Sequence, residues 1–82
     1  MGEAKLQLVT MPGCPYCVRA KVFLNKLGEP FDEMDVNSPQ GQAAIQTVGA
    51  NSVPIFLKGT RHLVGFRPDV LTEFLGRKLI VP

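Results

Sequence analysis

Residues 6–27 decide the fold and read LQLVTMPGCPYCVRAKVFLNKL. The first five residues are short and apolar enough for a buried strand, and Pro12-Gly13 ends it. From position 15 the apolar spacing becomes that of a helix, which Gly28 and Pro30 stop after about position 27. Its inward face is predicted to carry Cys17, Ala20, Phe23, Leu24 and Leu27. The stretch therefore predicts a strand, a turn and a helix, with Cys14-Pro15-Tyr16-Cys17 at the helix start.

Two thiols three residues apart at a helix start suit reversible redox chemistry. The reactive species is the thiolate, and the unpaired N–H groups and partial positive charge of a helix N-terminus stabilise an anion. Cys14 is therefore predicted to be the exposed, attacking sulfur. Cys17 is predicted to be sheltered and to resolve the mixed disulfide that Cys14 forms with a substrate. Pro15 at the first helical position has a fixed φ and no N–H, which stiffens the loop between the sulfurs.

Two structural uses of the cysteine pair compete with redox chemistry. Structural zinc needs four ligands, and the chain offers only two cysteines and the single His62, predicted to be a solvated strand residue. A structural disulfide closing so short a loop removes little chain entropy and does not persist in a reducing cytosol. Redox work is therefore favoured. Lys5 and Lys21 are placed near the sulfur-bearing loop, where either would favour a thiolate, although a solvated charge is the expected role of each.

Length and charge narrow the class of protein. The chain has 82 residues, enough for one small domain spanning residues 1–82, and a formal net charge of +2. Its nine basic residues are scattered among seven acids, which argues against nucleic acid or a membrane surface as the partner. The expected partner is another protein, and this chain is expected to be a monomer. The start Met1-Gly2-Glu3-Ala4-Lys5 has no signal-peptide pattern and no apolar run approaches about 18 residues, so a cytoplasmic location is expected.

The rest of the chain continues the alternation of strands and helices. Residues 31–36 alternate acidic and apolar side chains and predict a half-exposed edge strand. Ser38-Pro39 opens a short helix that ends at Gly49, with Ala44, Ile45 and Val48 inward. Gly41 inside that helix weakens it by about 1 kcal/mol relative to alanine.

The C-terminal half predicts a hairpin and a last helix. The apolar run 54–57 and the shorter run Leu63-Val64 flank Gly59-Thr60, which predicts two antiparallel strands. A helix begins near Pro68-Asp69 and ends at Gly76, with Val70, Leu71, Phe74 and Leu75 facing the core. The order is β-α-β-α-β-β-α, an α/β domain with a four-stranded mixed sheet and three helices.

This order, with the C-x-x-C motif between the first strand and the first helix, resembles the thioredoxin fold in the small form used by glutaredoxins. The resemblance covers nearly the whole chain. Ser52-Val53-Pro54 is similar to the Thr/Ser-Val-Pro segment of that family, which implies a cis-proline facing the thiols and a Val53 backbone free to pair with an extended substrate. The alternative is an ordinary trans proline at a strand start.

A second segment, Gly65-Phe66-Arg67-Pro68-Asp69, divides the family. Glutathione-using glutaredoxins usually carry Gly-Gly-x-Asp here, whereas this chain has Pro68 where the acid is expected. Losing that carboxylate forfeits a charge-assisted hydrogen bond to the glutathione amine, about 1.5–3 kcal/mol. The segment is similar to that of NrdH redoxins, although a helix start with a core phenylalanine and a solvated arginine would also account for it.

The NrdH resemblance implies a partner on each side of the redox cycle. Thioredoxin reductase would reduce the protein with electrons from NADPH, and ribonucleotide reductase would receive them, with the redox-active disulfide as the only redox group and no metal. The implied substrate-binding residues are Val53, Pro54, Gly65, Phe66, Arg67 and Asp69.

Three alternatives stay open beside the NrdH resemblance. The Cys-Pro-Tyr-Cys loop is usual in glutathione-dependent glutaredoxins, which reduce disulfides and remove glutathione from proteins, so glutathione stays the alternative partner. The other two are an iron–sulfur carrier that shares a cluster through Cys14 and a redox-inactive binding module. Tyr16 is predicted to be an exposed docking surface beside Cys14, with packing on the helix as its alternative role.

Overall fold

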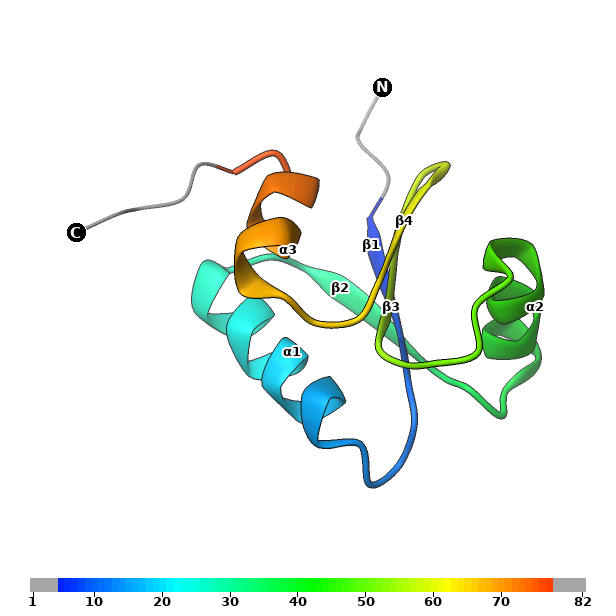
Figure 1. Cartoon of the computed structure of the whole chain (residues 1–82). Coiled ribbons are helices and arrows are strands. Elements are labelled where there is room, and N and C mark those ends of the chain that lie inside the picture. The colour runs from blue at the N-terminus through cyan, green and yellow to red at the C-terminus, as the bar shows by residue number, and fades with distance from the viewer. Residues whose placement is uncertain (1–4, 78–82) are drawn as a thin grey trace.

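Seven elements follow one another in the predicted order along residues 5–77, the part of the chain that the computed structural model describes (Figure 1). Residues 1–4 and 78–82 are not described, so the expectation about the start of the chain lies outside the described residues. The elements are β1 (Leu6–Thr10), α1 (Pro15–Leu27), β2 (Phe31–Asp35), α2 (Pro39–Val48), β3 (Ile55–Lys58), β4 (Arg61–Val64) and α3 (Pro68–Phe74).

The strands form one mixed sheet in the order β2-β1-β3-β4. β1 pairs with β2 in parallel and with β3 antiparallel, and β3 pairs with β4 through the predicted hairpin. Of the two inner strands, β1 is the more buried, with Leu6, Leu8 and Val9 fully enclosed, whereas β2 lies at an edge and exposes its acids. These findings confirm the α/β class, the element order and the mixed sheet.

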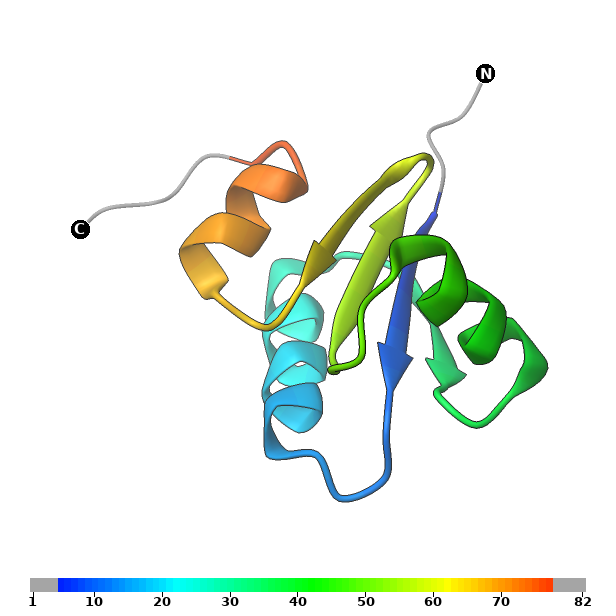
Figure 2. The same cartoon turned by 45° about the vertical axis from the view of Figure 1, so that its right-hand side comes forward.

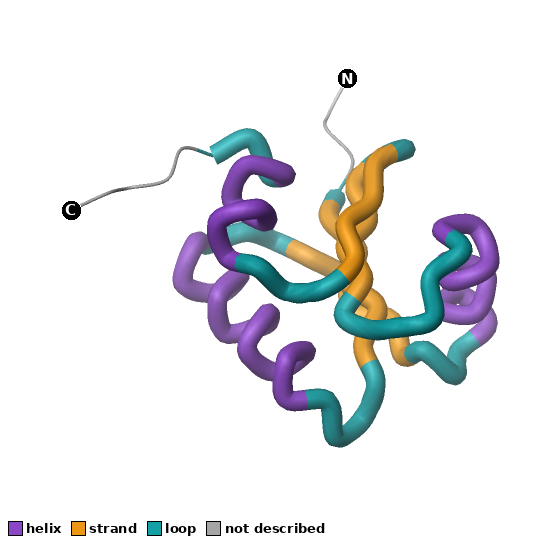
Figure 3. Tube along the Cα trace, viewed as in Figure 1, coloured by secondary structure: helices purple, strands orange, loops and turns teal. Residues whose placement is uncertain are grey.

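The helices cover both faces of the sheet. α1 and α3 lie together on one face and α2 lies on the other, as Figure 2 and the tube in Figure 3 show. The main core lies under α1 and α3 and joins Leu6, Leu8, Ala20, Leu24, Phe56, Leu71 and Phe74. Each of the large aliphatic or aromatic side chains contributes about 1.5–3 kcal/mol when fully buried, so this core holds α1 firmly against the sheet.

α2 approaches the sheet at a glycine. Ser38 is its N-cap and accepts a hydrogen bond from the Gly41 N–H at 3.0 Å, as in ordinary capped helices. Gly41 is buried, and a Cβ there would collide with the backbone carbonyl of Asp35. Gly41 lowers the helix propensity of α2, but it is also the residue that lets α2 pack closely on the end of β2.

Gly41→Ala is expected to destabilise the protein by about 1–3 kcal/mol, the usual cost of overpacking, despite the better helix propensity of alanine. The reason is that the colliding atom belongs to the backbone and has no rotamer to move into. Urea unfolding followed by circular dichroism measures the change. Gln46→Ala on the exposed face of α2 is the control and should change the unfolding free energy by less than about 0.5 kcal/mol. A stabilised Gly41→Ala protein would show that the helix does not approach so closely.

Candidate active site

Cys14 is the N-cap residue of α1. Its backbone is extended, with φ −89° and ψ 110°, and its Sγ accepts a hydrogen bond from the Cys17 N–H at 3.2 Å. Pro15 occupies the first turn, as predicted, and needs no N–H partner. A sulfur at this position meets the positive end of the helix and one of its free N–H groups, the arrangement that stabilises a thiolate.

Both cysteines are free thiols, and both are buried. The exposed fraction is 8% for Cys14 and 2% for Cys17. The expectation that Cys14 is exposed was therefore wrong, although its order relative to Cys17 was right. The reason is the capping geometry, because the Cys14 side chain turns back over the first turn of α1 instead of pointing into solvent.

Cys17 is held in its protonated form. Burial, together with the hydrogen bond to Cys14 and the negative charge there, raises the pKa of the Cys17 thiol to about 11, against smaller opposing effects of the Met11 backbone and the Lys21 charge. Cys17 therefore stays a neutral thiol near pH 7. A resolving step through this sulfur requires removal of its proton.

Lys21 lies one helical turn after Cys17 and is anchored to the sheet. Its Nζ is 3.2 Å from a Glu33 carboxylate oxygen that also accepts a 2.6 Å hydrogen bond from the buried Thr10 hydroxyl. The Thr10 hydrogen bond and the Lys21 ammonium lower the pKa of Glu33, although its partial burial opposes them. Lys5 does not approach the cysteines, since it precedes β1 at the end opposite Cys14 and pairs with Asp32 at 3.1 Å.

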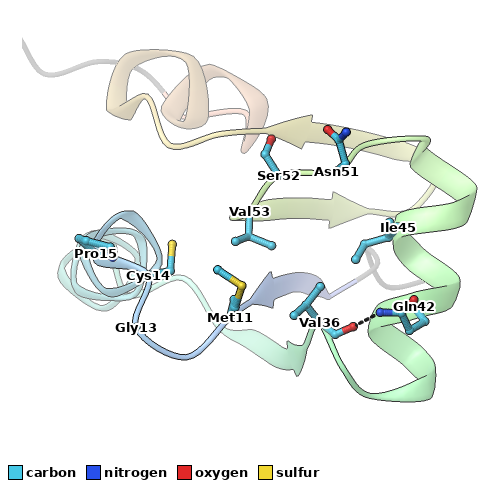
Figure 4. Close-up of a pocket in the computed structure, with 10 residues that line it drawn as sticks. All are labelled: Met11, Gly13, Cys14, Pro15, Val36, Gln42, Ile45, Asn51, Ser52 and Val53. Carbon is cyan, nitrogen blue, oxygen red and sulfur yellow. Dashed lines mark hydrogen bonds between the residues drawn. The ribbon is translucent and has the colours of Figure 1, made fainter.

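The loop before β3 carries the predicted cis-proline. The Val53-Pro54 peptide bond is cis, which confirms that prediction. Pro54 is buried and its carbonyl accepts a hydrogen bond from the Gly65 N–H at 2.8 Å, which ties this loop to the segment before α3. Val53 precedes the first paired residue of β3, and its side chain points to the space between Cys14 and Met11 (Figure 4).

A first groove, called the α3-side groove, runs from the C-x-x-C loop toward α3. It has a volume of about 340 Å³ and is lined by Tyr16, Val53, Pro54, Val64, Gly65, Phe66 and Arg67. It thus brings together the predicted substrate-binding residues except Asp69, which lies in the first turn of α3 and is exposed. Arg67 is the only charged residue among the described ones that line it. Phe66 also packs edge-on against Phe23 at 5.6 Å between ring centroids, so it has a core role as well.

A second and larger groove, called the α2-side groove, lies on the α2 side of Cys14. It has a volume of about 600 Å³ and is lined by Met11, Gly13, Cys14, Pro15, Val36, Gln42, Ile45, Asn51, Ser52 and Val53. Sequence reasoning missed this groove because Ile45 was assigned to the core by its helical spacing. Four segments far apart in the chain build it, and nothing in the local patterns brings them together (Figure 4).

Within residues 5–77 no group of three His, Cys, Asp or Glu side chains is placed to hold a metal ion. His62 is exposed on β4, as predicted. None of the helices described is long and apolar enough to span a bilayer.

The fold and the capped cysteine pair beside a cis-proline define a dithiol protein of the thioredoxin-like class. The family model described as Glutaredoxin matches residues 6–63, and the chain belongs to the glutaredoxin family. Thiol-disulfide oxidoreductase activity is the general activity of that family.

Individual proteins and one solved structure are similar to this chain. Gene 56 protein of Mycobacterium phage L5 is 35% identical over 75 residues, covering 88% of this chain and 73% of the relative. Glutaredoxin 3 of Escherichia coli K12 is 33% identical over 64 residues, covering 76% of this chain and 77% of the relative. The solved structure of the glutaredoxin-like protein NrdH-redoxin from Escherichia coli superposes with a TM-score of 0.74 at 24% identity, covering 84% of this chain and 92% of that one.

Proposed function

We propose that this protein is a dithiol electron carrier that reduces disulfides of other proteins. The observation that carries the proposal is the Cys14 sulfur at the N-terminus of α1, hydrogen-bonded to the Cys17 N–H and facing the loop with the cis-proline. The site offers a nucleophile, a second thiol one turn behind it and a groove on each side. These are the parts that disulfide exchange needs.

The exchange proceeds in two displacements. The Cys14 thiolate attacks one sulfur of the substrate disulfide, the substrate S–S bond breaks, and the other substrate sulfur leaves as a thiolate that takes up a proton. Cys17 then loses its proton and attacks the Cys14 sulfur, which releases the second substrate thiol. Two electrons have passed to the substrate and a Cys14-Cys17 disulfide remains. A reductase must return two electrons from NADPH before the next cycle.

We infer further that the reductase is thioredoxin reductase and the acceptor is ribonucleotide reductase, with a monomer acting in the reducing cytoplasm. The support is the segment 65–69, with Asp69 outside the α3-side groove. Without a carboxylate in that groove, the amine of glutathione has no charged partner there. The NrdH-redoxin of Escherichia coli, which shares the fold of this chain, is a glutaredoxin-like protein with a thioredoxin-like activity profile.

A glutathione-dependent glutaredoxin is the second candidate. It is favoured by Pro15-Tyr16 between the cysteines, by the likeness to Glutaredoxin 3 and by Arg67 in the α3-side groove, which offers a cation to a glutathione carboxylate. The two candidates use the same sulfur chemistry and differ in what restores the dithiol.

The choice of electron donor separates the candidates. NADPH oxidation is followed with insulin as the disulfide substrate, with either thioredoxin reductase or glutathione plus glutathione reductase as the donor system. We expect turnover with thioredoxin reductase and a rate at least about tenfold lower with glutathione, because one lost charge-assisted bond corresponds to one to two powers of ten. Turnover with glutathione alone would contradict the NrdH-like assignment and establish the second candidate.

A further inference from the structure

The α2-side groove has apolar walls, and the described residues that line it include no Asp, Glu, Lys, Arg or His. These apolar residues come from four segments. Met11 lies in the β1-α1 loop, Val36 directly follows β2, Ile45 lies in α2 and Val53 lies in the loop before β3. In Figure 4, Met11 and Val53 lie next to the Cys14 sulfur, and Val36 and Ile45 lie toward the α2 end of the same groove. The groove is therefore part of the reacting site and not a separate surface.

The polar groups of this groove offer little to an anion. Gln42 donates its side-chain amide to the Val36 carbonyl at 2.6 Å, and the Val36 N–H is bonded to the Thr10 carbonyl at 2.8 Å. Asn51 and Ser52 are neutral and exposed. A carboxylate entering the groove would lose water without meeting a cation, whereas an aliphatic side chain would exchange water for apolar contacts.

The groove lies beside the path that the backbone of a polypeptide substrate would take. Val53 lines both grooves and Cys14 lines this one, so a polypeptide whose cysteine reaches Cys14 passes along Val53 and places neighbouring side chains in the groove. Glutathione has only two residues beside its cysteine, and neither carries an aliphatic side chain while both end in carboxylates. A protein disulfide can supply the apolar group that the groove fits.

We propose that the groove formed by Met11, Val36, Ile45 and Val53 is a specificity pocket for protein disulfides and receives an aliphatic side chain within two residues of the attacked cysteine. This inference rests on the proposed disulfide exchange and names the class of substrate for it. The side chain that enters the pocket belongs to the reacting polypeptide. Its binding therefore stabilises the transition state of the exchange step and raises the rate of that step.

The test uses short peptides that carry one cysteine in a disulfide with 5-thio-2-nitrobenzoate. The coloured thiolate is the better leaving group, so Cys14 attacks the peptide sulfur and absorbance reports the rate. Leucine, asparagine and glutamate are placed in turn at each of the two positions before and after the cysteine. We expect leucine to react about tenfold to a hundredfold faster than glutamate at one or more of these positions, with asparagine between them. Rates within about twofold at all four positions would overturn the pocket.

A pair of matched variants localises the effect. Met11 and Val22 are 47% and 48% exposed, one at the groove and the other on the outer face of α1. Met11→Lys is expected to reduce the leucine preference to less than about twofold, because it supplies a cation for the glutamate carboxylate. Val22→Lys adds the same charge away from the groove and should leave the preference unchanged. An equal change in both variants would overturn the assignment to this groove.

The peptide experiment tests the specificity pocket separately from disulfide exchange itself. Reduced protein that releases no coloured thiolate from any peptide, and no reduction of insulin, would contradict disulfide exchange itself. Release from every peptide at one rate would leave the exchange intact and remove the pocket. Circular dichroism of the two lysine variants checks that both keep the fold, as expected for substitutions at half-exposed positions.

Discussion

Cys14→Ser is expected to reduce protein disulfide reduction to the uncatalysed background, a loss of about a thousandfold or more. The serine hydroxyl can still cap α1, but it is far less ionised than a thiol and forms no mixed disulfide. The remaining Cys17 cannot replace it, since its side chain is 2% exposed and burial alone raises the pKa of its thiol. Insulin reduction with NADPH and a reductase measures the loss, and full activity in this variant would contradict the role of Cys14.

Cys17→Ser is the matched variant and should fail at the next step. Cys14 still attacks, but no internal thiol displaces the substrate, so a covalent complex of protein and substrate accumulates. Non-reducing electrophoresis and the intact mass detect this complex, and dithiothreitol releases it. If no complex forms with a disulfide substrate that the wild-type protein reduces, the two-step exchange is refuted.

The second large effect is the pH dependence of thiol alkylation. With a pKa of about 11, Cys17 is thiolate to about one part in ten thousand at pH 7. Iodoacetamide at pH 7 should therefore modify Cys14 alone, and the rate at Cys17 should rise about tenfold per pH unit until it levels near pH 11. Fragmentation mass spectrometry of the peptide that carries both cysteines follows the two sites separately at each pH.

Unfolded protein is the control for this experiment, because urea removes the burial that raises the Cys17 pKa and should make both cysteines react alike. The raised pKa also affects stability, because the folded protein binds the Cys17 proton more tightly than the unfolded chain does. This contribution to the free energy of unfolding is fully present below pH 9.0, the ordinary cysteine pKa, and is lost as the pH rises toward about 11. Alkylation of Cys17 in the folded protein at pH 7, at the rate found in urea, would show that the second thiol is not protected.

Local patterns were enough for the elements of the fold. Apolar runs located β1, β3 and β4, and the alternation of acidic and apolar residues located β2. Ser38, Gly28 and Gly49 marked helix ends that the structure confirms. The strand boundaries moved by one or two residues, since β2 ends at Asp35 and β3 begins at Ile55. Such shifts depend on which residues find a ladder partner, and no single segment determines that.

The site was predictable only in part. The spacing of the cysteines pointed to Cys14 and Cys17, and the resemblance of Ser52-Val53-Pro54 to the glutaredoxin segment implied the cis bond at Pro54. Burial of Cys14 was not predictable, because it follows from how the side chain caps α1. The α2-side groove was missed as well, since it exists only after the chain segments bearing Val36 and Ile45 have folded beside the cysteine loop. Contacts between distant segments leave no local signal in one sequence.

The most direct test of the exchange is the covalent state of the protein after one turnover. Reduced protein is mixed with an excess of a protein disulfide, quenched with acid and digested without reductant. We predict that Cys14 and Cys17 are recovered joined by a disulfide, with two hydrogen atoms lost from the protein and two new thiols on the substrate. Both cysteines recovered as free thiols, with the substrate reduced, would contradict the proposed chemistry.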